Sequence, residues 1–308
     1  LCLLAVWLAL PSFAVAEPVE IELGVLTPRL VFADNLARSE AAREIAGALS
    51  AATGLPIVGR AFATTADLET FAAAGRLGLV IMDAALAAES PLSLQVLGRG
   101  AGPEGATPRL AVLTREPSAG IAALAGRGLV LTRVGASEPA LLANLAFEGQ
   151  LTLPAFFGAV TERPDPTDAA EWVRSGRAGA MLGWASQAEV LKLRVAATLE
   201  GFPLPVLAAV RGRVDDASLL AISSALRGDG VALGGATMTH LRAAKNDVLA
   251  AVRRAATAPA GTARSQRAIW SPARAGTLEA PYQPAPLGRY TLEPPRDRLR
   301  LPDFEPVD

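Results

Sequence analysis

Buried strands and amphipathic helices alternate along the first hundred residues, and this alternation constrains the fold more than any other feature of the sequence. Residues 19–26 (VEIELGVL) predict a strand that becomes buried, and a helix follows that Asp34 is expected to cap. A second strand near residues 57–61, a helix over 67–74 and an apolar strand over 77–82 continue the pattern. Units of this kind favour a largely parallel sheet.

The same alternation returns in the second half of the chain. The predicted elements are strands over 109–114, 128–132 and 178–183, and helices over 118–125, 137–148 and 168–174. Each half has about the size of a small domain. The sequence therefore predicts an α/β protein of two lobes, each a mostly parallel sheet with flanking helices.

A short internal echo is consistent with two related halves. Residues 71–83 (FAAAGRLGLVIMD) align without gaps on residues 172–184 (WVRSGRAGAMLGW), and the alignment matches Gly75 with Gly176. Glycine is useful where a helix ends and a strand begins. Chance similarity in a chain rich in Ala and Arg is the alternative explanation, so the echo alone does not establish a duplication.

Composition excludes several classes of protein. A hydrophobic fraction of 51% is too high for a disordered chain, and 29 basic against 30 acidic side chains give a net charge of −1, which argues against nucleic-acid binding. One Cys and one His leave almost no ligands for a metal site. We expect no metal and no cofactor.

Nothing in the sequence marks an enzyme. His240, the single His, is predicted to lie in a helix, and GxSxG, HExxH and P-loop patterns are absent. The Gly-rich segment 98–108 lacks GK[ST] and is expected to be a loop between the lobes. We identify no catalytic residue and expect a protein that is not an enzyme, with a small hydrolase or transferase as the remaining alternative.

The first sixteen residues have the pattern of a secretory signal peptide. The apolar run LCLLAVWLALPSFAVA is broken at Pro11 and ends with small residues at Ala14 and Ala16, so that Glu17 is the expected first mature residue. A membrane anchor is the alternative, but a spanning helix needs about 20 apolar residues and the proline interrupts this run. We expect export and a periplasmic location.

The order of elements and several short segments resemble a known family. GVLTP after the first strand, TGLP before the second, RLAVLTREPSAGIAALAGRGLVLTRVGAS and SGRAGAMLGW are similar to type II periplasmic solute-binding proteins. The branch that binds phosphonate, phosphite and phosphate for ABC transporters is the most similar. The resemblance spans residues 19–256, and it implies lobe one over 17–108, lobe two over 109–203, and a return to lobe one with closing helices over 204–256.

The resemblance also implies a ligand site between the lobes, where strand ends and helix N-termini converge. Free backbone N–H groups and hydroxyls there suit a small anion. The residues at matching positions are Thr27, Arg29, Thr64, Thr65, Asp83, Gly135, Ala136, Ser137, Trp184 and Ser186. Several have an ordinary structural explanation as well: helix capping for Thr64, Thr65, Ser137 and Asp83, core packing for Trp184 and a solvated surface position for Arg29.

Two functions remain open. The first is an exported protein that captures a small anion, either a phosphonate- or phosphate-like oxyanion or an organic acid, for an inner-membrane ABC permease. The second is a degenerate fold of the same kind that acts as a periplasmic sensor or interaction module with a protein partner, because the GAS loop at 135–137 has fewer hydroxyls than that family's pattern. The Pro-rich tail, residues 257–308, is either a disordered segment or an extended strap that packs Trp270, Tyr282, Tyr290 and Phe304 onto the body or a partner.

Overall fold

The structure is a computed structural model. It describes residues 20–102, 109–117, 120–132, 134–136, 138–147, 149, 152–199, 202, 204–235, 237–244 and 247–258. The predicted signal segment (1–16), Ser137 and nearly all of the Pro-rich tail lie outside the described residues. Within these ranges, no helix combines the length and the apolar character that a membrane crossing requires.

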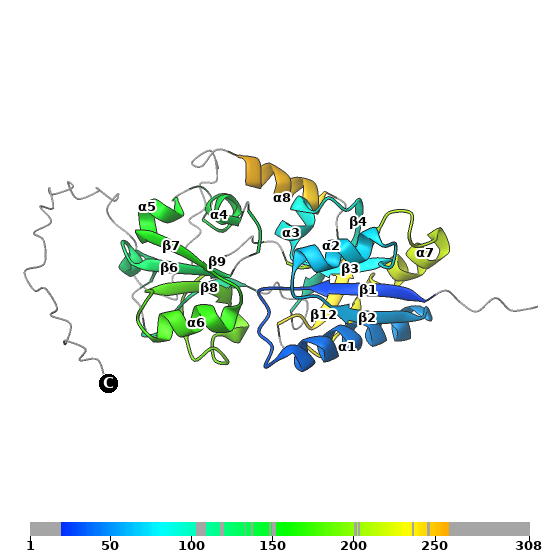
Figure 1. Ribbon diagram of the computed structural model, residues 1–308, viewed down its shortest axis with the longest axis horizontal. Helices are drawn as coiled ribbons and strands as arrows, with labels where there is room; N and C mark the ends of the chain where they lie inside the picture. Colours follow the sequence, from blue (N-terminus) through cyan, green and yellow to red (C-terminus); the bar gives the residue numbers. More distant parts are fainter. Residues whose placement is uncertain are drawn as a thin grey trace, which may run out of the picture. The chain divides into compact units, whose positions relative to one another are not determined.

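Twelve described strands form two sheets. The larger sheet has the order β11-β12-β4-β10-β3-β1-β2 and the smaller has the order β7-β6-β8-β5-β9 (Figure 1). We call each sheet with its helices lobe one and lobe two, respectively. The strands of lobe one are β1 (Ile21–Leu26), β2 (Ile57–Ala61), β3 (Leu79–Met82), β4 (Leu94–Ala101), β10 (Val206–Val210), β11 (Val231–Ala232) and β12 (His240–Ala243). Those of lobe two are β5 (Leu110–Thr114), β6 (Gly128–Thr132), β7 (Ala159–Arg163), β8 (Ala180–Trp184) and β9 (Arg194–Leu199).

Helices cover both faces of each sheet. The α-helices are α1 (Asn35–Thr53), α2 (Thr65–Ala73), α3 (Ala84–Glu89), α4 (Glu138–Leu141), α5 (Leu153–Phe157), α6 (Pro166–Arg174), α7 (Asp216–Ala225) and α8 (Val248–Thr257). Two 3-10 turns, η2 (Ile121–Leu124) and η4 (Ala185–Gln187), and one π-turn, η3 (Leu142–Ala146), complete the described elements.

The two sheets share one topology. In each, three parallel strands in the order second, first, third are followed by a strand that runs antiparallel to them, β10 in lobe one and β5 in lobe two. Each of these antiparallel strands is the first that the chain forms after it leaves the other lobe. The sequence echo falls on equivalent strands, β3 and β8, and both glycines adopt a positive φ, +77° at Gly75 and +78° at Gly176. The echo therefore corresponds to a repeated architecture.

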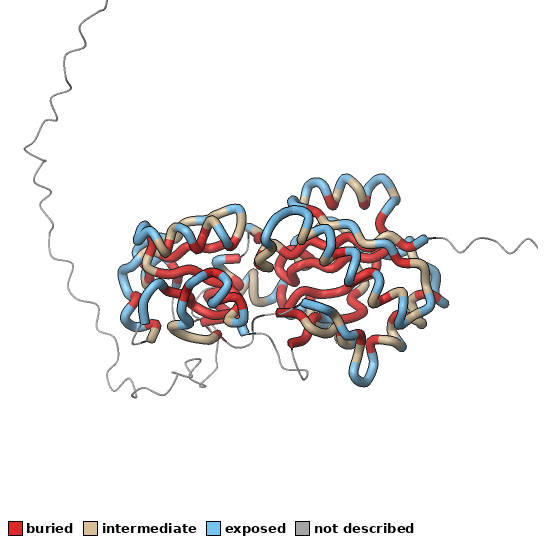
Figure 2. Tube along the Cα trace, turned by 90° about the horizontal axis from the view of Figure 1, so that it is seen from below, coloured by how far each residue is buried: buried red, intermediate tan, exposed pale blue. Residues whose placement is uncertain are grey.

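Alternating strand residues form a separate core on each face of each sheet. In lobe one, Leu23 and Ile81 pack with α1 and α7, whereas Val80 and Met82 pack with α2, α3 and α8. The central strands are buried along their whole length in both lobes (Figure 2). Burial on both faces accounts for the continuous apolar runs that predicted these strands.

The predicted α/β fold of two lobes is confirmed, and each sheet is mixed, because the strand that enters from the other lobe runs antiparallel to the three parallel strands beside it. Two predictions about individual segments are wrong. The predicted closing helix that contains His240 is instead β12 followed by α8, since His240–Ala243 pairs with β4. Residues 98–101 of the predicted interlobe loop belong to β4, because they pair with β12.

Candidate functional site

A cleft of about 570 Å³ lies where the two lobes meet. Lobe one lines it with the residues after β1, the N-terminus of α2 and the C-terminus of α3, and lobe two with the loop after β6 and the end of β7. Ligands of α/β proteins bind outside the carboxyl ends of such strands. Four of the predicted site residues line this cleft: Thr64, Thr65, Gly135 and Ala136.

The two threonines begin α2. The hydroxyl of Thr64 accepts a hydrogen bond from the N–H of Asp67 at 3.1 Å, so Thr64 is the N-cap of the helix. Thr65 is half-buried and is the first helical residue. Capping therefore explains Thr64, whereas Thr65 lines the cleft without serving as the cap.

Carboxylates of the chain itself bind the amides of the lobe-two loop. The N–H of Ala136 donates to Oε2 of Glu89 at 3.0 Å, and the N–H of Val134 donates to Oε2 of Glu138 at 3.1 Å. A side chain at Gly135 would place its Cβ 2.8 Å from Oε2 of Glu89, so the carboxylate would have to shift to make room for it. Glu89 belongs to lobe one, and its contact with Ala136 joins the two lobes.

Arg29 follows Pro28, which lines the cleft, and its side chain lies between two acidic residues in a buried group that we call the base of the cleft. Its guanidinium pairs with Asp83, which follows β3 in lobe one, and with Glu138, the first residue of α4 in lobe two. All three side chains are at most 3% exposed. The guanidinium also lies 4.8 Å from the ring centre of Phe202. Arg29 is thus a buried bridge between lobes, not the solvated surface residue that the sequence allowed.

Burial and ion pairing oppose each other in this group. Burial by itself would lower the pKa of Arg29, but the attraction of Asp83 and Glu138 outweighs it and raises that pKa. Burial raises the pKa of Glu138 above its ordinary value, against the lowering effect of Arg29.

Asp83 has two roles. One carboxylate oxygen accepts a hydrogen bond from the N–H of Ala85 at 3.2 Å, which caps α3, and the other pairs with Arg29. The capping explanation for Asp83 is therefore correct, and the residue also lies in the group at the base of the cleft.

Two other predicted residues lie elsewhere between the lobes. Thr27 and Ser186 line a separate cavity of about 190 Å³. The Ser186 hydroxyl lies 2.9 Å from that of Thr237, so it is engaged with lobe one. These residues do not join the four that line the larger cleft.

Trp184 does not line the cleft. It ends β8, the strand equivalent to the one before Asp83, but its ring is 1% exposed and packs in the lobe-two core. Its Nε1 has no hydrogen-bond partner among the described residues. Burial of a large apolar ring among leucines explains this position, so core packing is the correct explanation of Trp184.

Apolar packing also crosses the boundary between lobes. After β1, Leu30 and Val31 pack against the two cores of lobe two. In return, Val134 and Leu141 of lobe two join a lobe-one core together with α8. The contact between the lobes is therefore built partly like a protein interior.

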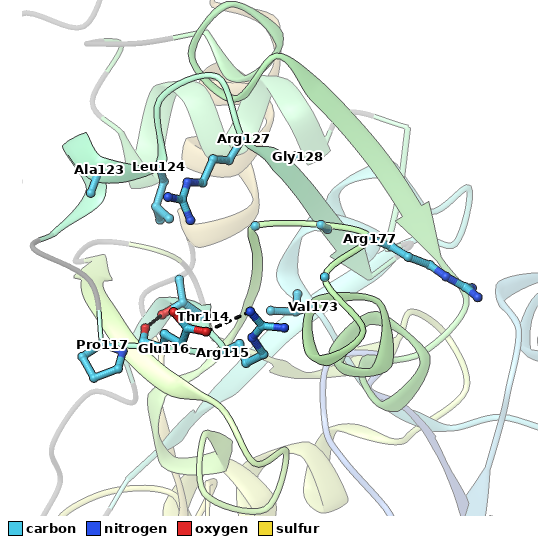
Figure 3. Close-up of a pocket in the computed structure, with 13 residues that line it drawn as sticks. Thr114, Arg115, Glu116, Pro117, Ala123, Leu124, Arg127, Gly128, Val173 and Arg177 are labelled. Carbon is cyan, nitrogen blue, oxygen red and sulfur yellow. Dashed lines mark hydrogen bonds and ion pairs between the residues drawn. The ribbon is translucent and has the colours of Figure 1, made fainter. Parts of the chain in front are cut away.

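A third cavity, of about 470 Å³, lies beside the start of β6 and the residues that precede β8. Figure 3 shows Arg115 and Arg127 pointing toward the same space, whereas Arg177 points away from it. Arg115 pairs there with Glu116 at 2.8 Å. None of the predicted site residues lines this cavity. Among the described residues, no group of three His, Cys, Asp or Glu side chains could hold a metal ion.

Comparison with known proteins identifies the fold. No protein-family model matches the sequence, and no curated protein matches it. A binding-protein component of an ABC phosphonate transporter from Pseudomonas aeruginosa has a similar structure, with a TM-score of 0.56 and 11% identity over 78% of this chain and 86% of that one. The chain has the periplasmic binding-protein fold.

A second protein of this fold comes from Xanthomonas citri. Its structure bound to ATP has a TM-score of 0.53 and 14% identity, and its structure bound to a chloride ion has a TM-score of 0.51 and 15% identity. Each comparison covers 77% of this chain and 98% of that one. At such identities the similarity establishes the architecture and carries no ligand with it.

Sequence reasoning missed three residues of the binding-protein cleft and its base. Glu89 and Glu138 each supply a carboxylate. The side-chain amide of Gln187 holds the segment after β1 against lobe two. Its nitrogen donates to the Arg29 carbonyl at 3.1 Å, and its oxygen accepts from the Val31 N–H at 2.9 Å. Glu138 and Gln187 directly follow the predicted residues Ser137 and Ser186, and these positions were the available signal. Glu89 lies outside every pattern that marked the site.

Proposed function

We propose that this protein is an exported, non-enzymatic solute-binding protein that takes a small solute with an acidic group into the cleft between its lobes. The observation that carries the proposal is the pair of hydrogen bonds from the Val134 and Ala136 amides to carboxylates. Backbone amides that bind a carboxylate of the chain have the geometry to bind the carboxylate, phosphonate or phosphate of a solute.

The remaining lining suggests a second group on the solute. Glu69 lines the same cleft as Thr65 and Ala136, and the described lining contains no Lys or Arg. Carboxylates favour a solute that also carries an ammonium group, because a purely anionic solute would meet like charges. Aminoalkylphosphonates and amino acids therefore fit better than phosphate or acetate.

The test is a binding screen on the full chain by thermal shift and calorimetry. Matched pairs separate the two groups: methylphosphonate against aminoethylphosphonate, and acetate against glycine. The proposal predicts saturable binding of at least one acidic solute and tighter binding of the amino-bearing member of its pair. Failure of every member to bind would remove the proposal.

A single substitution locates the binding site. Thr65→Ala removes a hydroxyl from the cleft, and one hydrogen bond contributes about 0.5–1.5 kcal/mol, which corresponds to a roughly 2- to 12-fold weaker Kd. Thr70→Ala in the same helix is the control, since Thr70 is exposed and bonds only the Ala66 carbonyl. Equal effects of the two substitutions would place the solute elsewhere.

Under this proposal the chain reaches the periplasm through residues 1–16 and delivers its solute to an inner-membrane ABC permease, without a cofactor. The resemblance in sequence and the binding-protein fold support this placement. N-terminal sequencing of the exported protein tests the cleavage before Glu17, and a crosslinking screen with inner membranes tests the permease.

A second candidate function is a periplasmic sensor or interaction module of the same fold. The buried bridge from Arg29 to Glu138 favours it, because the lobes are joined there by side chains and need no solute between them. Pull-down with the full chain and with a chain lacking residues 257–308 tests this candidate, since loss of a specific partner with the tail is expected only for an interaction module.

A further inference from the structure

Carboxylates of the chain itself make polar contacts at the base of the cleft. Arg29 joins Asp83 to Glu138, and the Ala136 amide is bound by Glu89. Two of these contacts, Arg29 to Glu138 and Ala136 to Glu89, cross from one lobe to the other. The carboxylate of Glu89 thus binds the Ala136 amide, where the acidic group of a solute would bind.

Helix α8 contacts the same two lobes outside the cleft. Leu249 and Val252 pack on the core that α3 shares with Leu141 of lobe two. The Asn144 amide donates to the carbonyls of Ala255 (2.8 Å) and Ala258 (3.0 Å), at the end of α8. On the other side, Arg253 donates to the Ala88 carbonyl of α3 at 2.9 Å. The helix is therefore hydrogen-bonded to both lobes.

We propose that the lobes are held closed in the solute-free protein by its own side chains, with Glu89 as a tethered substitute for the acidic group of a solute and the pair of Arg29 and Glu138 as a second contact between the lobes. A solute then enters by displacing Glu89, the exposed member, from the Ala136 amide. Arg29 and Glu138 stay in place as a buried bridge. This inference concerns how the proposed solute site is regulated. The displacement step rests on the proposed function, whereas closure of the lobes needs no solute.

This arrangement differs from a hinge that closes only around its ligand. In a protein of that kind, the closed state is favoured by the ligand's contacts with both lobes. Here the buried ion bridge and the apolar packing of Leu30 and Val134 supply those contacts from within the chain. The closed state is then the resting state, and the solute competes with a carboxylate for a site that is already formed.

The experiment measures the distance between lobes without any solute. Spin labels are placed on exposed residues of α2 and α5 by Ala66→Cys and Ala155→Cys, in full-length protein with Cys2→Ser, and read by double electron–electron resonance. The test variant combines Glu89→Ala with Glu138→Gln, and circular dichroism verifies its folding. Glu89→Ala alone is a second variant that leaves the core untouched. Glu69→Ala is the matched control, because it removes a cleft carboxylate that no described amide binds.

We expect a single narrow distance distribution for the labelled protein without cleft substitutions and for the labelled Glu69→Ala control. The double variant should show a second population at a longer distance. Glu89→Ala alone should show the same longer population at a lower fraction. A solute-free protein that already shows two populations would overturn the inference, and so would variants indistinguishable from the parent or a control that opens equally. Because no solute is present, this failure is separate from a failure of the proposed function, which the binding screen decides.

Discussion

The ion group at the base of the cleft makes a quantitative prediction for Arg29→Met. The substitution leaves Asp83 and Glu138, which are 1% and 3% exposed, without their shared cation. Removing one partner of a buried ion pair costs about 3–5 kcal/mol, because the other partner is left as an uncompensated charge. For a folded unit of this size, each kcal/mol lowers Tm by about 2–4 °C, so we expect a loss of roughly 6–20 °C.

The assay is urea unfolding at neutral pH followed by tryptophan fluorescence. Arg60→Met is the matched control: Arg60 also pairs with a glutamate, Glu22, but is 49% exposed, and such surface pairs contribute about 0–1 kcal/mol. If Arg29→Met costs no more free energy of unfolding than this control, the bridge is not the buried ion group described above. Combining Arg29→Met with Asp83→Asn and Glu138→Gln should restore most of the loss, since no buried charge then remains.

Two further predictions concern protonation and packing. Burial raises the pKa of Glu138, so the stabilisation from its protonated form is complete below the unfolded pKa and is lost as pH rises through the folded value. The protein should lose more unfolding free energy from mildly acidic to alkaline pH than Glu138→Gln does, and equal slopes in urea titrations would contradict this. Gly59→Ala would place its Cβ 2.0 Å from the Ala42 carbonyl oxygen, at the contact of β2 with α1, so we expect a loss of about 1–3 kcal/mol. Gly47→Ala in α1 meets nothing within 4 Å and should gain about 0.5–1 kcal/mol by the same measurement.

Local patterns predicted many elements closely. The strands β2 and β6 have the predicted bounds, and Asp34 caps α1 by accepting a hydrogen bond from the Ala37 N–H at 2.8 Å. Caps and buried strands depend on residues a few positions apart, so their physical cause is present in the sequence itself.

The error around His240 has the opposite origin. The segment HLRA contains Leu, Arg and Ala, which favour helices, and the sequence predicts a helix there. Pairing with β4, which lies far away in the sequence, makes it a strand. Tertiary pairing outweighs propensity in such short segments, because each residue contributes only a fraction of a kcal/mol to helix preference.

By itself, the sequence determined the α/β alternation and the turns after strands in which Thr65, Asp83 and Gly135 lie. Only the tertiary structure decided which groups meet there. Arg29 and Glu138 are separated by 109 residues, and Glu89 and Ala136 by 47. Nothing in the local sequence of either partner specifies the other, because their contact depends on how two separately formed lobes come together. In the folded protein Arg29, which the sequence predicts to bind an anion, is therefore a buried bridge to the chain's own carboxylates.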